Sequence, residues 1–189
     1  MYLNFNKPIH HWNYFLAIED DLINTSRYVE FTIDNMKTYS VEYTKIILSA
    51  ASEVDVLLKQ IYSSFGYKKK QPNFKDFCDV LKIKLNSLIT EQLCLEQYGI
   101  TLCPFEEWKN DSQPGWHTAY NNLKHNRTLN YKEANLENAL LSVGALYSTV
   151  VHYYLCSTPL KAGIEERHLL DFTHSLSPMP KLIRFIRFL

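Results

Sequence analysis

The sequence predicts an all-α fold, a helical bundle with an appended C-terminal tail. From Ser40 to Phe65 apolar side chains recur at alternating steps of four and three, which is the spacing of a buried helix face and not of a strand. Two further stretches begin with a helix-capping signal that is followed by an apolar face. Of the 189 residues 46% are hydrophobic, which is ample for a core within a single domain. We therefore expect a bundle over residues 1–158 and a C-terminal extension over residues 159–189 that packs on the bundle or on a partner.

The longest predicted helix runs from Ser40 to Phe65. It is expected to end near Gly66, because the stretch GYKKKQP combines a glycine suited to a helix C-cap with three lysines and a proline. A further helix is favoured for the middle of the N-terminal stretch HHWNYFLAIEDDLINTSRYVEFTI. The apolar stripe of the long helix consists of Tyr43, Ile47, Ala50, Val54, Leu57 and Ile61.

Asn73 is the expected N-cap of the next helix, because Asp76 stands three residues on, at the reciprocal position of a capping box. A shorter helix is expected over residues 114–126, where the preceding polar residues and Pro114 suit a first helical turn. The buried face of the helix that starts at Asn73 would be Phe74, Phe77, Leu81, Leu85 and Leu88.

The last long helix is expected to begin at Asn130, with Glu133 at the third position, and to end at the Ser-Thr-Pro sequence of residues 157–159. Before it, the sequence YGITLCP at residues 98–104 is a candidate for a short extended segment. In the tail, PKLIRFIRFL spaces basic residues at threes among apolar ones. This segment is expected to dock on the bundle or on a partner chain, although contact with a membrane surface or with RNA is also conceivable.

Composition and charge exclude several classes of protein. The 20 basic and 20 acidic residues cancel, so any attraction to nucleic acid must come from a local patch. The start has no secretory pattern and no apolar run reaches about 18 residues, so we expect a cytoplasmic protein without a membrane span. The 4 cysteines form no C-x-x-C pair and the 5 glycines form no phosphate loop, so neither a metal nor another cofactor is expected.

A dense polar cluster follows QPGW in the predicted shorter helix. At about 100° per residue, His117, Asn121 and His125 fall on successive turns of one arc. Arg127 is expected to lie below Tyr120. The members of the cluster are His117, Tyr120, Asn121, Lys124, His125 and Arg127.

Two interpretations of this cluster remain open. An imidazole at His125 flanked by Lys124 and Arg127 is suited to a phosphate ester, because one group takes a proton while the others stabilise negative charge. Alternatively, Asn121 and His125 hydrogen-bond the backbone of the long helix and lock two helices together. In either case Glu53 of the long helix lies at the edge of the apolar stripe and is expected to pair with Lys124 or Arg127.

The stretches ILSAASEVDVLLKQI, CPFEEW, PGWHTAYNNLKHNR and ANLENALLSVGALYSTVVHYYL together resemble a bacterial family of helical proteins related to the HEPN superfamily (higher eukaryotes and prokaryotes nucleotide-binding). The resemblance covers about residues 40 to 156. It implies a helical bundle that is commonly dimeric. Many members are metal-independent ribonucleases of toxin-antitoxin and phage-defence systems, and others serve as scaffolds or binding modules.

Active HEPN proteins carry an Arg followed by a His after four to six residues, and two such motifs meet at a dimer interface. In this sequence the stretch KHNR departs from that pattern, because His125 precedes its Arg127. The literal match is Arg167 with His174, which lies in the tail. The resemblance therefore supports the fold more than the reaction.

The resulting hypothesis is a dimeric, HEPN-like protein of RNA-directed defence or a toxin. Its catalytic residues would be His125, Asn121 and Arg127, with His125 transferring the proton. Its substrate contacts would be Lys124, Tyr120 and His117. The alternatives are a noncatalytic interaction module, in which the same cluster is architectural, and a protein that binds or senses a nucleotide between its helices.

Overall fold

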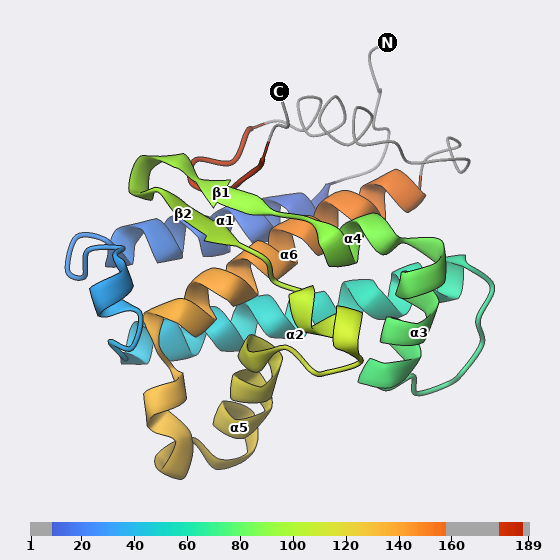
Figure 1. Cartoon of the computed structure of the whole chain (residues 1–189), viewed down its shortest axis with the longest axis horizontal. Helices are drawn as coiled ribbons and strands as arrows, with labels where there is room; N and C mark the ends of the chain where they lie inside the picture. The colour runs from blue at the N-terminus through green and yellow to red at the C-terminus, as the bar shows by residue number, and fades with distance from the viewer. Residues whose placement is uncertain (1–8, 158–177, 187–189) are drawn as a thin grey trace.

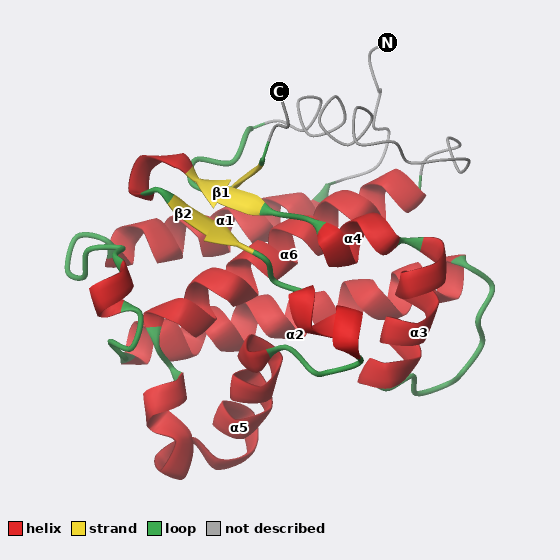
Figure 2. Cartoon of the chain, viewed as in Figure 1, coloured by secondary structure: helices red, strands yellow, loops and turns green. Residues whose placement is uncertain are grey.

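The computed structural model describes residues 9–157 and 178–186 (Figure 1). In these residues it contains six α-helices and a small three-stranded sheet, as the colouring of Figure 2 shows. The helices are α1 (His10–Thr25), α2 (Val41–Ser64), α3 (Phe74–Lys84), α4 (Asn86–Thr90), α5 (Gly115–Asn130) and α6 (Leu136–Cys156). The strands are β1 (Leu93–Leu95), β2 (Ile100–Leu102) and β3 (Arg184–Phe185). Short 3-10 turns are η1 (Ile33–Asn35), η2 (Glu96–Tyr98), η3 (Glu106–Asn110) and η4 (Tyr131–Glu133).

The core lies between α2 and α6, which pack along each other, with α1 against both. α6 is buried on nearly all sides, because α1, α2, α5 and the sheet surround it. Among the described residues α6 alone has the length and hydropathy of a membrane-spanning helix. Since 89% of its most apolar stretch is buried inside the protein, its apolar surface belongs to the core.

The expected start of α3 and end of α2 are confirmed. Asn73 and Asp76 form a full capping box, in which the side chain of each accepts a hydrogen bond from the backbone N–H of the other. Gly66 follows the last turn of α2 with φ of 88°, a conformation that glycine adopts without strain.

The expected start of α6 at Asn130 is wrong. The N-cap is Asn135, whose side chain accepts a hydrogen bond from the N–H of Asn138 at 3.0 Å. Asn130 carries the same sequence signal, but its amide donates to the carbonyl of Asn126 at 2.9 Å. Backbone pairing of Asn135 with Tyr39 fixes the true boundary through a contact distant in sequence.

The sheet is the main departure from an all-helical fold. Its strand order is β2-β1-β3, with both pairs antiparallel. β2 confirms the extended segment expected within residues 98–104. The sheet lies against α6 at Gly144, where a Cβ atom would stand 3.2 Å from side-chain carbons of Leu93 and Leu102.

The C-terminal segment, residues 178–186, is extended and packs on the bundle. The buried carboxylate of Glu19 in α1 accepts hydrogen bonds from the backbone N–H groups of residues 181–183. Phe185 packs on Tyr147 with ring centroids 4.8 Å apart. The extension therefore continues the sheet and covers α1 and α6, whereas residues 158–177, with the expected domain boundary, lie outside the described part.

Candidate functional site

α5 carries the polar cluster that the sequence singles out. Its buried face is held by Trp116, whose indole N–H donates to the carbonyl of Pro104 at 2.7 Å, and by Ala119 and Leu123. This face packs against α2 and α6. In Figure 1 the far end of α5, with η4, projects from the body of the molecule.

His117 lies at the buried end of the cluster and joins three helices. Its Nε2 is 3.3 Å from Oδ1 of Asp55 in α2, and its ring stacks on Phe74 of α3 with centroids 5.0 Å apart. The amide of Asn121 donates to Nδ1 at 3.4 Å, which places the ring proton on Nε2, where it faces Asp55. His117 thus links α5 to α2 and α3, and Asn121 orients its ring.

Glu53 does not meet α5. Its Oε1 lies 2.5 Å from Nδ1 of His11 in α1, so the expected pairing with Lys124 or Arg127 is wrong. Glu53 and Asp55 are two positions apart, which turns their side chains by about 200° around α2. Asp55 is therefore the carboxylate of α2 that faces α5.

The outer end of the cluster is exposed to solvent. The Nζ of Lys124 donates a hydrogen bond to the phenol oxygen of Tyr120 at 3.2 Å and lies 5.2 Å from the ring centroid. His125 and Arg127 are both exposed. The helix is interrupted at Asn126, with φ of −150° and ψ of 70°, so Arg127 does not lie two turns below Tyr120 as a regular helix predicts.

Two further polar residues organise this end of the molecule. Asn122 donates to both carboxylate oxygens of Glu133 at 3.0 Å, which holds η4 against α5. The role of Asn122 is not evident from the sequence, because it depends on the return of the chain after the kink.

Residues 124–132, which we call the α5–η4 tip, contain two lysines, one arginine and one histidine and no carboxylate.

A second titratable cluster lies inside the protein. His152 of α6 is fully buried, and its Nδ1–H donates to the carbonyl of Ser148 at 2.9 Å. Its Nε2 lies 3.2 Å from both the hydroxyl of Ser87 and Oε1 of Glu91. Burial lowers the pKa of His152 to about 4, so the ring is neutral at pH 7 and the Ser87 hydroxyl donates to it. This is the satisfied core histidine that its position in an apolar helix indicates.

The one literal Arg-to-His match of the HEPN pattern, Arg167 with His174, lies outside the described residues. Within the described residues no group of three or more His, Cys, Asp or Glu side chains is arranged to hold a metal.

The polar cluster of α5 has two parts, an inner one that packs against other helices and an outer one that is exposed. The inner turn is occupied by structural hydrogen bonds, whereas the outer turn presents an imidazole and cations to solvent. Comparison with protein-family models, curated proteins and solved structures finds no match to this chain. The assignment of a function therefore depends on the geometry of these residues.

Proposed function

We propose that the chain is an RNA-targeting, HEPN-like protein that contacts RNA through the α5–η4 tip. The observation that carries the proposal is the exposure of Lys124, His125 and Arg127 together on a projecting end of the structure. Although the whole chain has a net charge of zero, the tip has three permanent cations, and the adjacent carboxylate of Glu133 is bound by the amide of Asn122. Such a local patch attracts the phosphate backbone where the average field does not.

The proposed reaction is cleavage of RNA without a metal ion. His125 takes the proton of a ribose 2′-hydroxyl, whose oxygen attacks the adjacent phosphorus while the bond to the 5′-oxygen breaks. Arg127 and Lys124 stabilise the negative charge that develops on the phosphate oxygens. The products are a 2′,3′-cyclic phosphate and a 5′-hydroxyl, which receives its proton from a second acid.

A homodimer would supply that second acid. The tip carries one imidazole, and general acid-base cleavage uses a base on one side of the phosphate and an acid on the other. Two tips brought together across a two-fold axis would provide both, which is the role of the composite site in the superfamily that the sequence resembles. Action as a cytoplasmic toxin or in phage defence is part of the same proposal.

Arg127→Gln is expected to weaken binding of a single-stranded RNA by about fivefold at 0.1 M salt, because it removes one phosphate contact. The slope of log affinity against log salt should fall in magnitude by about 0.7. Fluorescence anisotropy with a labelled oligonucleotide measures both quantities. The matched control is Arg27→Gln, which removes an exposed arginine at the end of α1 and should leave affinity and slope unchanged.

His125→Ala is expected to reduce RNA cleavage by about 10² to 10⁴-fold. Because the ring is exposed, the free energy of unfolding should change by less than about 0.5 kcal/mol. Gel analysis of a labelled RNA, beside DNA of the same sequence that lacks the 2′-hydroxyl, measures the reaction. If the His125→Ala variant cleaves RNA at the rate of the unchanged protein, His125 is not the proton-transfer residue.

A noncatalytic interaction module is the second candidate. It is favoured by His117 and Asn121, which are committed to helix packing and lie apart from the exposed His125. If RNA binds in a manner that depends on Arg127 but remains intact, the tip is a binding surface without catalysis.

A further inference from the structure

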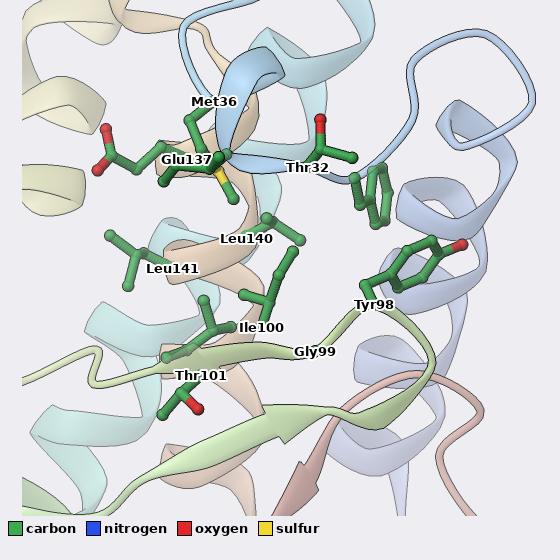
Figure 3. A pocket seen from close by; sticks show the side chains of 12 residues that line it. Thr32, Met36, Tyr98, Gly99, Ile100, Thr101, Glu137, Leu140 and Leu141 are labelled. Atoms are coloured by element: carbon green, nitrogen blue, oxygen red, sulfur yellow. The ribbon is translucent and has the colours of Figure 1, made fainter.

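A pocket opens between η1, β2 and the first turns of α6. Its volume is about 530 Å³, within the range of sites that bind small molecules or peptide side chains. Figure 3 shows it on the side of β2 that faces away from β1. The lining is mainly apolar and includes Phe31, Met36, Tyr98, Ile100, Leu140 and Leu141.

The strand that borders this pocket has a free edge. The backbone N–H of Ile186 donates to the carbonyl of Gln92, so Gln92 and Cys94 direct their backbone groups toward β3. Leu93 and Leu95 must then direct theirs toward β2, where they face Leu102 and Ile100. It follows that the N–H and C=O of Thr101, which lies between those two residues, point away from β1 and toward the pocket side.

The other edge of the same sheet already binds an extended segment. β3 adds to β1 through residues 184–185, with Phe185 buried and Arg184 exposed. A short strand with one buried apolar residue and one exposed basic residue is therefore a partner that this sheet accepts. Among the described strands β2 and β3 are the two edge strands, and the β2 edge is the one that borders the pocket.

The charge around the pocket specifies the partner further. The segments that line it, residues 30–37, 96–102 and 137–141, contain Glu30, Asp34, Glu96 and Glu137 and a single basic residue, Lys37. Glu137 pairs with Lys37, whereas Glu30, Asp34 and Glu96 are exposed on either side of the lining residues in sequence. The segments that line the pocket therefore carry a net negative charge, which complements a basic ligand.

We propose that the free edge of β2 and the adjoining pocket bind an extended, basic peptide segment of a partner protein. The peptide adds a fourth strand through the N–H and C=O of Thr101 and places one apolar side chain in the pocket. Its lysines or arginines interact with the exposed acidic residues of the segments that line the pocket, Glu30, Asp34 and Glu96. This site is separate from the α5–η4 tip, and its proposal does not depend on RNA binding.

The test uses the full chain and a fluorescein-labelled peptide, acetyl-Lys-Val-Lys-Phe-Lys-Val-Lys-Gly, with anisotropy as the readout. Saturable binding is expected below about 1 mM peptide. Thr101→Pro should weaken it at least about tenfold, because proline removes the outward N–H and is tolerated at a strand edge that makes no ladder bond there. Thr101→Val keeps that N–H, so it is expected to bind the peptide more tightly than Thr101→Pro does.

A second variant tests the pocket without altering the strand. Leu141→Lys places a charge among the lining residues and should also weaken binding at least about tenfold. Circular dichroism and thermal melting establish that each variant is folded. The proposal is overturned if a peptide with glutamate at the lysine positions binds equally well, if Thr101→Pro in its folded form binds with unchanged affinity, or if no peptide binds.

Discussion

Glu19→Ala is expected to lower the free energy of unfolding by about 3 to 5 kcal/mol, the largest effect that we predict for a single side chain. The carboxylate is fully buried and accepts backbone hydrogen bonds from residues 181, 182 and 183 at 2.8, 3.0 and 3.1 Å. Alanine would leave three donors without an acceptor at the point where the C-terminal segment joins α1. Urea denaturation at pH 7 measures the loss.

The same substitution should release the C-terminal segment before the bundle unfolds. Limited proteolysis followed by mass spectrometry is expected to show faster cleavage within residues 178–186 of the Glu19→Ala variant. Asp20→Ala is the matched control, because Asp20 is the next residue and pairs with the exposed amine of Lys181 at 2.8 Å. A surface pair of this kind contributes about 0 to 1 kcal/mol. If the Glu19→Ala variant unfolds at the same urea concentration as the unchanged protein, the C-terminal segment is held by its apolar contacts alone.

The helices could be predicted where a local signal and the tertiary contacts agree. The Asn73 capping box and the glycine at residue 66 act within one turn of chain, and both have the expected roles. The start of α6 could not be placed in this way, because Asn130 and Asn135 both resemble N-caps. Pairing of Asn135 with Tyr39, nearly a hundred residues earlier, decides between them.

The contacts of the polar cluster on α5 were also hard to predict, because most of them depend on residues that are distant in sequence. The four-residue spacing of His117 and Asn121 predicts that their side chains meet, and they do. Which carboxylate of α2 faces them depends on the rotation of that helix in the bundle, and the structure selects Asp55. No proline or glycine marks the kink at Asn126 in the sequence. The position of Arg127 could therefore not be derived from helical periodicity.

The short strands of the sheet also carry little local information. β1 and β2 have three residues each and β3 has two, so none is long enough to show an alternating pattern. The pairing of β1 with β3 brings together residues about ninety positions apart. The pocket beside β2 is a consequence of this assembly, because its lining comes from three separate stretches of chain.

Acidification is expected to destabilise the protein between about pH 6.5 and pH 4 through the single buried ring of His152. Burial lowers the pKa of this group from 6.5 to about 4, so in this range the unfolded chain binds a proton that the folded chain excludes. Stability therefore rises with pH across this window and is lost as pH falls. At about 1.4 kcal/mol per pKa unit, the full difference is about 3 kcal/mol.

Urea denaturation at pH 7.5, 6, 5 and 4 should show this slope. His152→Gln is expected to abolish the His152 contribution while lowering stability at pH 7.5, since the amide can keep one hydrogen bond to the Ser148 carbonyl but does not fill the ring's volume. His125→Gln is the matched control, because it makes the same substitution at an exposed position. The groups that face the buried ring are Ser87 from α4 and Glu91 from the turn that follows it.

The sign of the change in stability with pH also distinguishes a neutral His152 ring from a charged one. If the 3.2 Å contact between His152 and Glu91 were an ion pair, the folded protein would hold the ring proton more tightly than the unfolded chain. Stability would then fall as pH rises above about 6.5, because deprotonation would break the pair. A decrease in the free energy of unfolding between pH 6 and pH 7.5 that disappears in His152→Gln would thus establish a charged ring and contradict the neutral one assigned from its complete burial.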